Sequence, residues 1–506
     1  MHGAFPTVTL IRNARMRGIM PEMNVSSSKE ARTFMDRNGG SYDLRSAAEA
    51  ASRGVESSDP DAMYLAGLFT YLGEGGVPMD KDTAVQLFAK AAEAGSKEAA
   101  IVVSEFDRAD PGQMDGFLAL RFRGEQRDVE ACAELFDVYE EARKPAKKNH
   151  AEAIRWYTVC AEAGNVAAQY QIGFMYMMGK GVNKDRELAE RWLSEAAHNG
   201  SGDAMYRLGQ IYEQGMCYAE PDLKTAVLWY RKGSDAGSRD AQFALGCIHM
   251  APRSKYTDIR EANRLFELAA EQDHAEAQYQ IAMSYAMGDG MSKNPEKAAM
   301  WFERSCENGY QQAMVDFANM SFEGQVVPRN LERAAHWFTT AANNCNGYAQ
   351  YALACMYGNG MWFEQDDKEA LRWFREAAEM GEVNSQYCLG CFYYEGRGTD
   401  KDVEEAAMWF DQAAEKGHPA AQAFYGMLLV TGSGVKQDVQ EGLQMIEEAA
   451  GKEHAEAQFY LGKLYYDGEY VDRNIPRAKK FLNMAAKQGD CDAMALLNRI
   501  KTEKKR

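Results

Sequence analysis

Apolar and small residues recur along the chain at intervals of three and four, which is the spacing of one face of an α-helix. The pattern returns about every 36 residues from Asn165 to Gly489, and nine contiguous units follow one another there. Each unit predicts two helices separated by a turn, and the turn usually contains a glycine such as Gly179. The sequence therefore predicts an all-α chain built from repeated helix pairs.

The predicted first helix of each unit carries a small residue at one recurring position. This residue is Gly or Ala in all nine units: Gly173, Gly209, Gly246, Ala282, Ala318, Ala354, Gly390, Gly426 and Gly462. A side chain of this size lets another helix approach closely. We therefore expect another helix to pack in contact at this position.

The start of the predicted second helix is also marked by recurring chemistry. Asp or Asn stands there in all nine units, as at Asp185, and a short side-chain acceptor can cap the free backbone N–H groups of a helix. This acidic column is therefore interpreted as structural, and not as a metal or catalytic array. His274, His418 and His454 open three of the first helices. Their periodic placement favours a local structural role over metal binding.

The repeat pattern also suggests how the chain is divided. A clean further unit begins at Asp61, and diverged units precede Asn165. End repeats are expected to be atypical, because they must cap an open stack. The predicted segments are a disordered or poorly ordered N-terminal segment (1–42), a capping half-repeat (43–60), N-terminal repeats of which one is clean and two are diverged (61–164), nine contiguous repeats (165–489), and a capping helix with a basic tail (490–506). Residues 1–22 could be a native tail, a transit peptide or the product of a misassigned start.

These motifs together resemble the Sel1-like repeat family, which is related to the tetratricopeptide repeat. The likeness is most complete in residues 165–200, where Gly173, Tyr176, Asp185 and Trp192 stand at the family's positions. The resemblance implies a right-handed α-solenoid of about twelve two-helix repeats. It also implies a non-catalytic adaptor or scaffold for protein–protein interaction.

Composition and charge narrow the class of partner. There are 75 acidic and 57 basic residues, and the formal net charge is −18. Such a surface repels phosphate backbones, so a nucleic-acid partner is not expected. No apolar run is long enough for a transmembrane helix. The ten cysteines and the lack of an apolar export signal favour free thiols in the cytoplasm. The oligomeric state is left open.

Motifs for catalysis do not stand out in the sequence. It contains no phosphate-binding Gly-x-x-x-x-Gly-Lys-Ser/Thr loop, no His-Glu-x-x-His and no Gly-x-Ser-x-Gly. We therefore expect neither an enzyme nor a cofactor. Cys355, Cys388 and Cys391 are the best metal candidate, but no second Cys-x-x-Cys accompanies them, so small thiols that fill helix contacts are favoured over a zinc site.

Aromatic residues mark the predicted binding surface. By analogy with tetratricopeptide arrays, the residue three positions before the small residue faces the concave side, although each tyrosine there could instead pack against the neighbouring unit. An aromatic, Met-lined trough suits a peptide or helix with apolar anchors. Trp362 lies outside the repeated pattern, so it either folds over its own repeat or forms an exposed anchor. The predicted protein-binding residues are Tyr170, Phe174, Tyr206, Phe243, Tyr279, Met283, Phe322, Tyr351, Tyr387, Tyr394 and Trp362.

Two other functions remain as alternatives to an adaptor. The chain could be a neutralising partner, such as an immunity protein against a bacterial toxin, because members of the resembled family take part in contact between rival bacteria. It could also hydrolyse β-lactams, because a cysteine-rich branch of that family is associated with β-lactam binding. That branch carries a disulfide in each repeat, whereas this chain has no paired cysteines in every unit.

Overall fold

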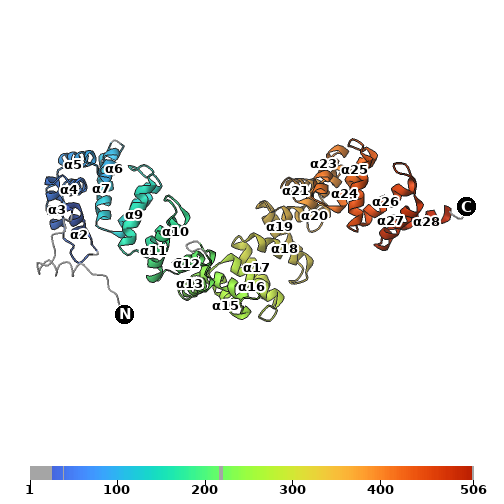
Figure 1. Cartoon of the computed structure of the whole chain (residues 1–506), viewed down its shortest axis with the longest axis horizontal. Coiled ribbons are helices and arrows are strands. Elements are labelled where there is room, and N and C mark those ends of the chain that lie inside the picture. Colours follow the sequence, from blue (N-terminus) through green and yellow to red (C-terminus); the bar gives the residue numbers. More distant parts are fainter. Residues whose placement is uncertain (1–25, 38, 107, 216–219, 504–506) are drawn as a thin grey trace. The chain divides into compact units, whose positions relative to one another are not determined.

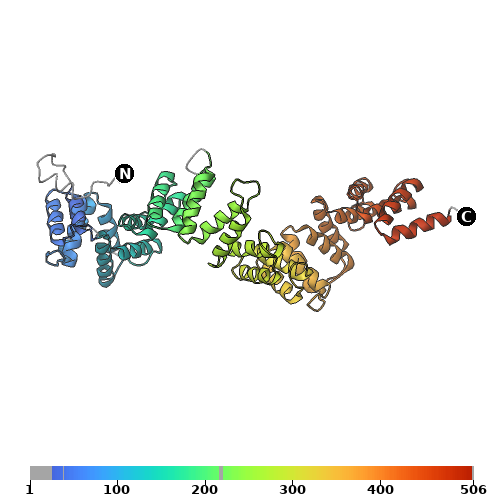
Figure 2. The same ribbon diagram turned by 90° about the horizontal axis from the view of Figure 1, so that it is seen from below.

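The computed structural model describes residues 26–37, 39–106, 108–215 and 220–503. Within these residues the chain forms 27 α-helices, α2 to α28, and no strands. The helices fall into two compact units, one up to Leu245 and one from Gly246. In both units successive helices lie side by side, as two perpendicular views show (Figures 1 and 2). The fold is an all-α repeat solenoid, as predicted.

The N-terminal unit begins with helices whose lengths vary and continues into regular pairs. Its helices are α2 (Ser27–Met35), α3 (Leu44–Glu56), α4 (Pro60–Leu72), α5 (Lys81–Glu93), α6 (Lys97–Phe106), α7 (Pro111–Glu125), α8 (Val129–Glu140), α9 (His150–Glu162), α10 (Val166–Met178), α11 (Arg186–His198), α12 (Gly202–Gln214) and α13 (Leu223–Asp235). The boundary between the two units falls inside α14 (Arg239–Met250).

The C-terminal unit is regular, and nearly all of its helices have 12 or 13 residues. Its helices are α15 (Ile259–Ala270), α16 (Ala275–Met287), α17 (Pro295–Glu307), α18 (Gln311–Glu323), α19 (Leu331–Asn343), α20 (Gly347–Gly358), α21 (Asp367–Glu379), α22 (Val383–Glu395), α23 (Val403–Glu415), α24 (Pro419–Thr431), α25 (Val439–Gly451), α26 (Ala455–Asp467), α27 (Ile475–Lys487) and α28 (Cys491–Glu503). The basic tail beyond Glu503 lies outside the described residues.

The small residues of the first helices make close helix contacts, as predicted. A Cβ atom at Gly173 would lie 2.8 Å from the side chain of Leu193, and one at Gly390 would lie 2.7 Å from the ring of Phe410. In each case the partner lies on the second helix of the same repeat. Because a larger side chain would have to displace that partner, these positions fix how closely the two helices pack.

The predicted helix caps are confirmed. Asp or Asn accepts a backbone N–H bond at the start of each of the nine second helices, for example from Leu188 to Asp185 at 2.9 Å. The three histidines that open first helices also act as caps. Nδ1 of His418 accepts a hydrogen bond from the backbone N–H of Ala421 at 3.2 Å, and His274 and His454 make the same contact. These polar columns are therefore structural.

A buried glutamine joins many first helices to the repeat before it, and the sequence analysis did not identify it. Its side-chain amide donates to a carbonyl near the end of the preceding second helix, as in the bond from Gln278 to Ala270 at 3.0 Å. The same bond recurs at Gln169, Gln242, Gln350, Gln386 and Gln458. It satisfies one of the carbonyls that a helix end leaves without an intrahelical partner.

The N-terminal end differs from what the sequence predicted. Residues 27–35, expected to be poorly ordered, form α2, in which Ala31 and Met35 are fully buried. α2 packs against α3, so α3 is half of a helix pair and not an isolated capping helix. The backbone N–H of Arg37 also donates to the carbonyl of Gln126 at 3.2 Å. This contact joins segments about 90 residues apart. The 36-residue periodicity could not predict it, because that pattern indicates contacts between neighbouring repeats only.

Candidate binding surface

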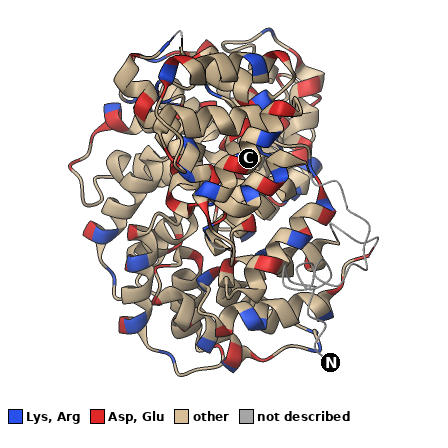
Figure 3. Cartoon of the chain, turned by 90° about the vertical axis from the view of Figure 1, so that its left-hand side faces the viewer, with Lys and Arg blue, Asp and Glu red and all other residues tan. Residues whose placement is uncertain are grey.

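From α10 onward the first helices leave one face largely open, and we call this face the open stripe of the helix. In α10 the open stripe comprises Ala167, Gln171, Phe174 and Met178, which are spaced by four, three and four residues. The side chain of Phe174 is partly buried, as is that of Met283 at the equivalent position of α16. Acidic and basic residues are interspersed along the helices of the chain (Figure 3). Repeat packing therefore presents two of the predicted binding residues at a surface.

The predicted aromatic column lies beside the open stripe and packs between repeats. The ring of Tyr279 lies 5.9 Å from that of Phe302 on the second helix of its own repeat, and 5.3 Å from Tyr310 at the start of the next. Its hydroxyl donates to Asp316 at 2.8 Å. Burial and this bond to a carboxylate raise the pKa of Tyr279. The hydroxyl stays protonated and links two successive repeats.

Tyr387 is packed in the same way. Its ring lies 5.8 Å from Phe410, 6.0 Å from Phe424 and 4.8 Å from the imidazole of His418, on which it stacks. Burial lowers the pKa of His418, and the charge of the nearby His454 acts in the same direction. The imidazole is therefore neutral at neutral pH, which matches its role as an acceptor at a helix start.

Two further column residues, Tyr170 and Tyr206, lie beside one cation, the guanidinium of Arg207. Tyr170 and Phe174 stack with ring centroids 6.3 Å apart, and the guanidinium of Arg207 lies 5.0 Å from the ring centroid of Phe174. Tyr206 accepts a hydrogen bond from Gln210 at 2.8 Å. These five side chains form a mixed aromatic and polar surface at the junction of α10 and α12.

The other predicted residues are placed as follows. The ring of Tyr351 lies 6.1 Å from that of Phe374, so Tyr351 also packs on its own second helix. Three more predicted residues are partly buried: Phe243, Phe322 and Tyr394. The binding role of the column stays a prediction that rests on the edges left exposed.

Trp362 is exposed and has an unusual backbone. Its side chain is 54% exposed, so it does not fold over its own repeat. Its φ angle is +71°, and the equivalent residues of other turns are glycines with almost the same angle, such as Gly398 and Gly434. A bulky residue in this left-handed region costs about 1–2 kcal/mol. Its neighbour Phe363 stacks on Tyr357, with centroids 4.3 Å apart, and packs the turn instead.

The cysteines give little sign of metal binding or redox chemistry. All nine cysteines in the described part of the chain are free thiols, and Cys217 lies outside it. Burial raises the pKa of Cys388, and it raises that of Cys391 to about 11. Both thiols are therefore protonated at neutral pH in the metal-free protein. Among the described residues no group of three or more His, Cys, Asp or Glu side chains is placed to hold a metal ion.

A buried cluster of charges in the N-terminal unit escaped the sequence analysis. Arg121 is fully buried in α7 and donates to Glu152 at 3.1 Å, to the hydroxyl of Tyr64 at 3.0 Å and to the hydroxyl of Tyr139. Desolvation raises the pKa of Tyr64 to about 12, so this phenol stays neutral. A buried arginine inside an apolar helix has no counterpart in the regular repeats, and neither periodicity nor spacing pointed to it.

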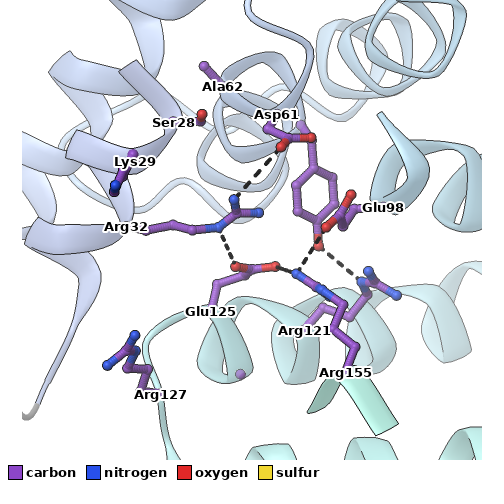
Figure 4. Close-up of polar contacts among 12 residues, drawn as sticks. Ser28, Lys29, Arg32, Asp61, Ala62, Glu98, Arg121, Glu125, Arg127 and Arg155 are labelled. Atoms are coloured by element: carbon purple, nitrogen blue, oxygen red, sulfur yellow. Dashed lines mark hydrogen bonds and ion pairs between the residues drawn. The ribbon is translucent and has the colours of Figure 1, made fainter. Parts of the chain in front are cut away.

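The cluster continues to the N-terminal helix α2 (Figure 4). Arg32 donates to Glu125 at 3.0 Å, and Arg155 donates to the same carboxylate at 2.8 Å. Arg155 also lies 3.3 Å from Glu98. Burial acts to raise the pKa of Glu125, but the charges and hydrogen bonds of the two arginines lower it to about 2. The carboxylate is therefore ionised and holds helices from distant parts of the sequence together.

A pocket in the same unit was also missed. It encloses about 520 Å³ between α8, α9, α10 and the turn that follows α10. Its lining residues are Phe136, Glu140, His150, Tyr157, Gln171, Phe174, Met175, Lys180 and Gly181. Matching the caps Asp128 and Asn165 would have revealed it, because this register places Phe136 at the position of Gly173.

No helix within the described ranges is long and apolar enough to cross a membrane. Comparison with protein families identifies eleven Sel1 repeats, at residues 60–96, 129–165, 166–201, 202–238, 239–274, 275–310, 311–344, 347–382, 383–418, 419–454 and 455–490. Residues 97–128, which contain α6 and α7, lie outside these matches.

One solved structure agrees with this assignment. The structure of c5321, a protective antigen of uropathogenic Escherichia coli with an SLR fold, is 26% identical with a TM-score of 0.52, over 96% of this chain and 92% of that one. A Sel1 repeat protein from Oxalobacter formigenes is 29% identical with a TM-score of 0.46, over 65% and 93%.

A weaker likeness concerns a protein of known class. The immunity protein Pa5087 from Pseudomonas aeruginosa is 18% identical with a TM-score of 0.27, over 44% of this chain and 87% of that one, which is too low to carry a functional argument. A search of curated proteins gives no match. The eleven matched repeats cover most of the sequence, and the chain belongs to the Sel1 repeat family.

Proposed function

We propose that this protein is a non-catalytic adaptor that binds a peptide or protein segment across the open stripes of its first helices. Sel1 repeat chains generally act as protein-interaction scaffolds. The observation that carries the proposal is the open stripe itself, which repeats along each unit and holds apolar side chains such as Phe174 and Met283 at a surface. Apolar anchors at helical spacing suit an extended or helical ligand.

The predicted aromatic residues contribute to this surface through their exposed edges. Tyr279, Tyr351 and Tyr387 are fixed by packing on the second helix of their repeat. Little side-chain entropy is therefore lost when a ligand contacts them, which favours rigid aromatic residues as binding anchors. We also propose Trp362 as a separate anchor. Its bulky side chain is exposed on a strained backbone, and strain of this kind is typical of functional positions.

The free thiols support a reducing compartment for this adaptor. The described cysteines are unpaired, and several are buried in helix contacts, as Cys306 is. Stable disulfides are rare in the cytoplasm and common outside it. We therefore place the proposed adaptor in the cytoplasm.

Capture from a native lysate, read by mass spectrometry, tests the adaptor proposal. The bait is the full chain, beside a stripe variant with Met283→Ser and Met287→Ser on the open stripe of α16. A matched control carries Met300→Ser and Met408→Ser, which remove two exposed methionines from second helices. We expect one or more proteins to be captured by the wild type and the control, and to be lost from the stripe variant.

The result that would refute the proposal is the reverse pattern. If the stripe variant still captures the protein and the control variant does not, the binding surface lies on the second helices. Circular dichroism of both variants checks that helix content is unchanged, so that a loss of binding cannot be ascribed to unfolding.

A further inference from the structure

The pocket beside α8 narrows the class of partner. We propose that the groove between α8, α9 and α10 binds a basic segment of a partner protein, and that this segment inserts one bulky apolar side chain into the pocket. The inference rests on the proposed adaptor function and deepens it. It depends on three observations: an altered helix joint, an apolar pocket and a row of carboxylates next to it.

The joint between α8 and α9 differs from the others in the chain. In a regular repeat the small residue faces one apolar side chain of the second helix, as Gly173 faces Leu193. At the equivalent positions Phe136 faces Tyr157, and their ring centroids are 4.0 Å apart. Two aromatic rings thus occupy a joint that elsewhere contains a residue without a large side chain.

A second position of α8 carries a smaller residue than most of the regular repeats do. The aromatic residue that packs between successive repeats, Tyr170 in α10, is replaced in α8 by Ala133, which is exposed. Ala133 therefore leaves this part of α8 without the aromatic ring that most of the other repeats carry, although it does not itself line the pocket.

The inside of the pocket is apolar and its rim is polar. Phe136, Tyr157, Phe174 and Met175 supply apolar surface. The rim carries Gln171, Lys180, and Glu140 with its carboxylate 2.7 Å from Nδ1 of His150. A volume of about 520 Å³ is within the range of sites that enclose a small ligand, so it accepts any single apolar side chain.

The helix that forms one wall of the pocket carries carboxylates along its open stripe. The stripe of α8 consists of Glu130, Glu134, Asp137 and Glu141, and we call it the acidic stripe. At 1.5 Å per residue it extends for about 16 Å. A small molecule held in the pocket would leave this row unused. A peptide that crosses α8 would meet it, and Lys or Arg side chains would complement it.

The acidic stripe already stabilises one guanidinium. Arg143 lies 2.6 Å from Glu141, and this hydrogen bond and charge, together with the charges of Asp137 and Glu134, raise the pKa of Arg143. Arg123 lies 3.9 Å from Glu130 at the other end of the stripe. Each end of the stripe thus meets one arginine of the chain itself, and the loop that follows Arg143 adds three lysines, Lys144, Lys147 and Lys148. Glu134 and Asp137, in the middle of the stripe, are the carboxylates offered to arginines of a partner.

Peptide selection on the full-length protein tests this inference. A phage library of random 12-residue peptides is panned on the wild type, and fluorescein-labelled copies of the selected peptides are measured by fluorescence anisotropy. We expect the selected peptides to combine Lys or Arg with a Phe, Trp, Leu or Met. We also expect their dissociation constants to rise at least tenfold between 50 and 500 mM NaCl, because salt screens exposed charges.

Two variants separate the contributions of charge and pocket. The charge variant is Glu130→Gln, Glu134→Gln and Asp137→Asn, and its control neutralises three exposed acids of second helices, with Glu187→Gln, Glu195→Gln and Asp235→Asn. The pocket variant is Gln171→Trp, which places a large side chain at the rim.

The control for the pocket variant is Leu228→Trp on the exposed face of α13. We expect the charge and pocket variants each to weaken binding at least tenfold. Both controls should bind within twofold of the wild type.

Several outcomes would overturn the inference. These are enrichment of acidic or uncharged peptides, no enrichment above a surface without protein, or equal binding by the pocket variant and its control. Occupation of the groove by a second copy of the chain would also overturn it, and sedimentation would then show a dimer that Gln171→Trp dissociates. If the lysate capture succeeds while these tests fail, the adaptor proposal stands and only this inference is lost.

Discussion

Neutralising one buried carboxylate should destabilise the N-terminal unit by a predictable amount. The side chain of Glu125 is 4% exposed and binds both Arg32 and Arg155. Its pKa of about 2, against an ordinary value of 4.5, corresponds to about 3 kcal/mol at 1.36 kcal/mol per pH unit. Breaking a buried ion pair by removing one partner costs about 3–5 kcal/mol. We therefore expect Glu125→Gln to lower the free energy of unfolding by about 3 kcal/mol at pH 7.

The destabilisation caused by Glu125→Gln should depend on pH in a defined direction. The folded state lowers the pKa of Glu125, so its contribution is fully present above the unfolded pKa of 4.5 and is lost as the pH falls towards 2. At pH 3.5 about 2 kcal/mol remains by the same relation. The difference between wild type and Glu125→Gln should therefore shrink on acidification.

Hydrogen-exchange mass spectrometry measures this difference locally. Wild type and variant are compared at the same pH, at 7 and at 3.5, so intrinsic exchange rates cancel, and peptides from α2, α7 and α9 report on the cluster. The control is Glu130→Gln on a fully exposed carboxylate 3.9 Å from Arg123, for which we expect a change below about 0.5 kcal/mol. Equal effects of the two substitutions at pH 7, or an effect of Glu125→Gln that grows on acidification, would refute the reasoning.

Two further changes test the packing and the turn. Gly209→Val should lower the urea midpoint by the equivalent of about 2–3 kcal/mol, because its Cβ would overlap the ring of Tyr230, whereas Gly116→Ala, in the interior of α7 with no atom in reach, should stabilise the protein by about 0.5–1 kcal/mol. Trp362→Gly should raise the unfolding free energy of its repeat by about 1 kcal/mol by relieving the left-handed backbone, and Trp362→Ala should not, since Ala keeps the strain. A thermal melt in which Ala stabilises as much as Gly would contradict the second.

The fold was predictable because the same types of residue recur at the same positions of each repeat. The small residue, the capping Asp or Asn and the second-helix packing recur in register, so nine similar units reinforce one another. The candidate site was only partly predictable. The column of Tyr279 and Tyr387 was identified, but how far packing buries these rings depends on neighbours in the next repeat.

What the sequence did not reveal lies where the repeat breaks down. Arg121 and Glu125 occur in a segment without the 36-residue register, and their partners come from helices that are distant in the sequence. Phe136 was overlooked for a related reason, because a one-residue difference in repeat length hid its equivalence to Gly173. The periodicity of a single sequence reveals neither the buried charges nor the equivalence of Phe136 to Gly173.

The caps and the buried glutamines set the ways in which this chain can change its length during evolution. Each second helix takes its cap from its own repeat, as α23 does from Asp402, and many successive repeats meet through the same glutamine bond. A whole repeat can therefore be duplicated or deleted in this region, and the new neighbours find the contacts they need. The opposite holds around Glu125, because deletion of α2 or of α9 would remove one of the two arginines that stabilise this buried carboxylate. Growth and shortening of the array are thus confined to its regular part, while the charged N-terminal end is inherited as one piece.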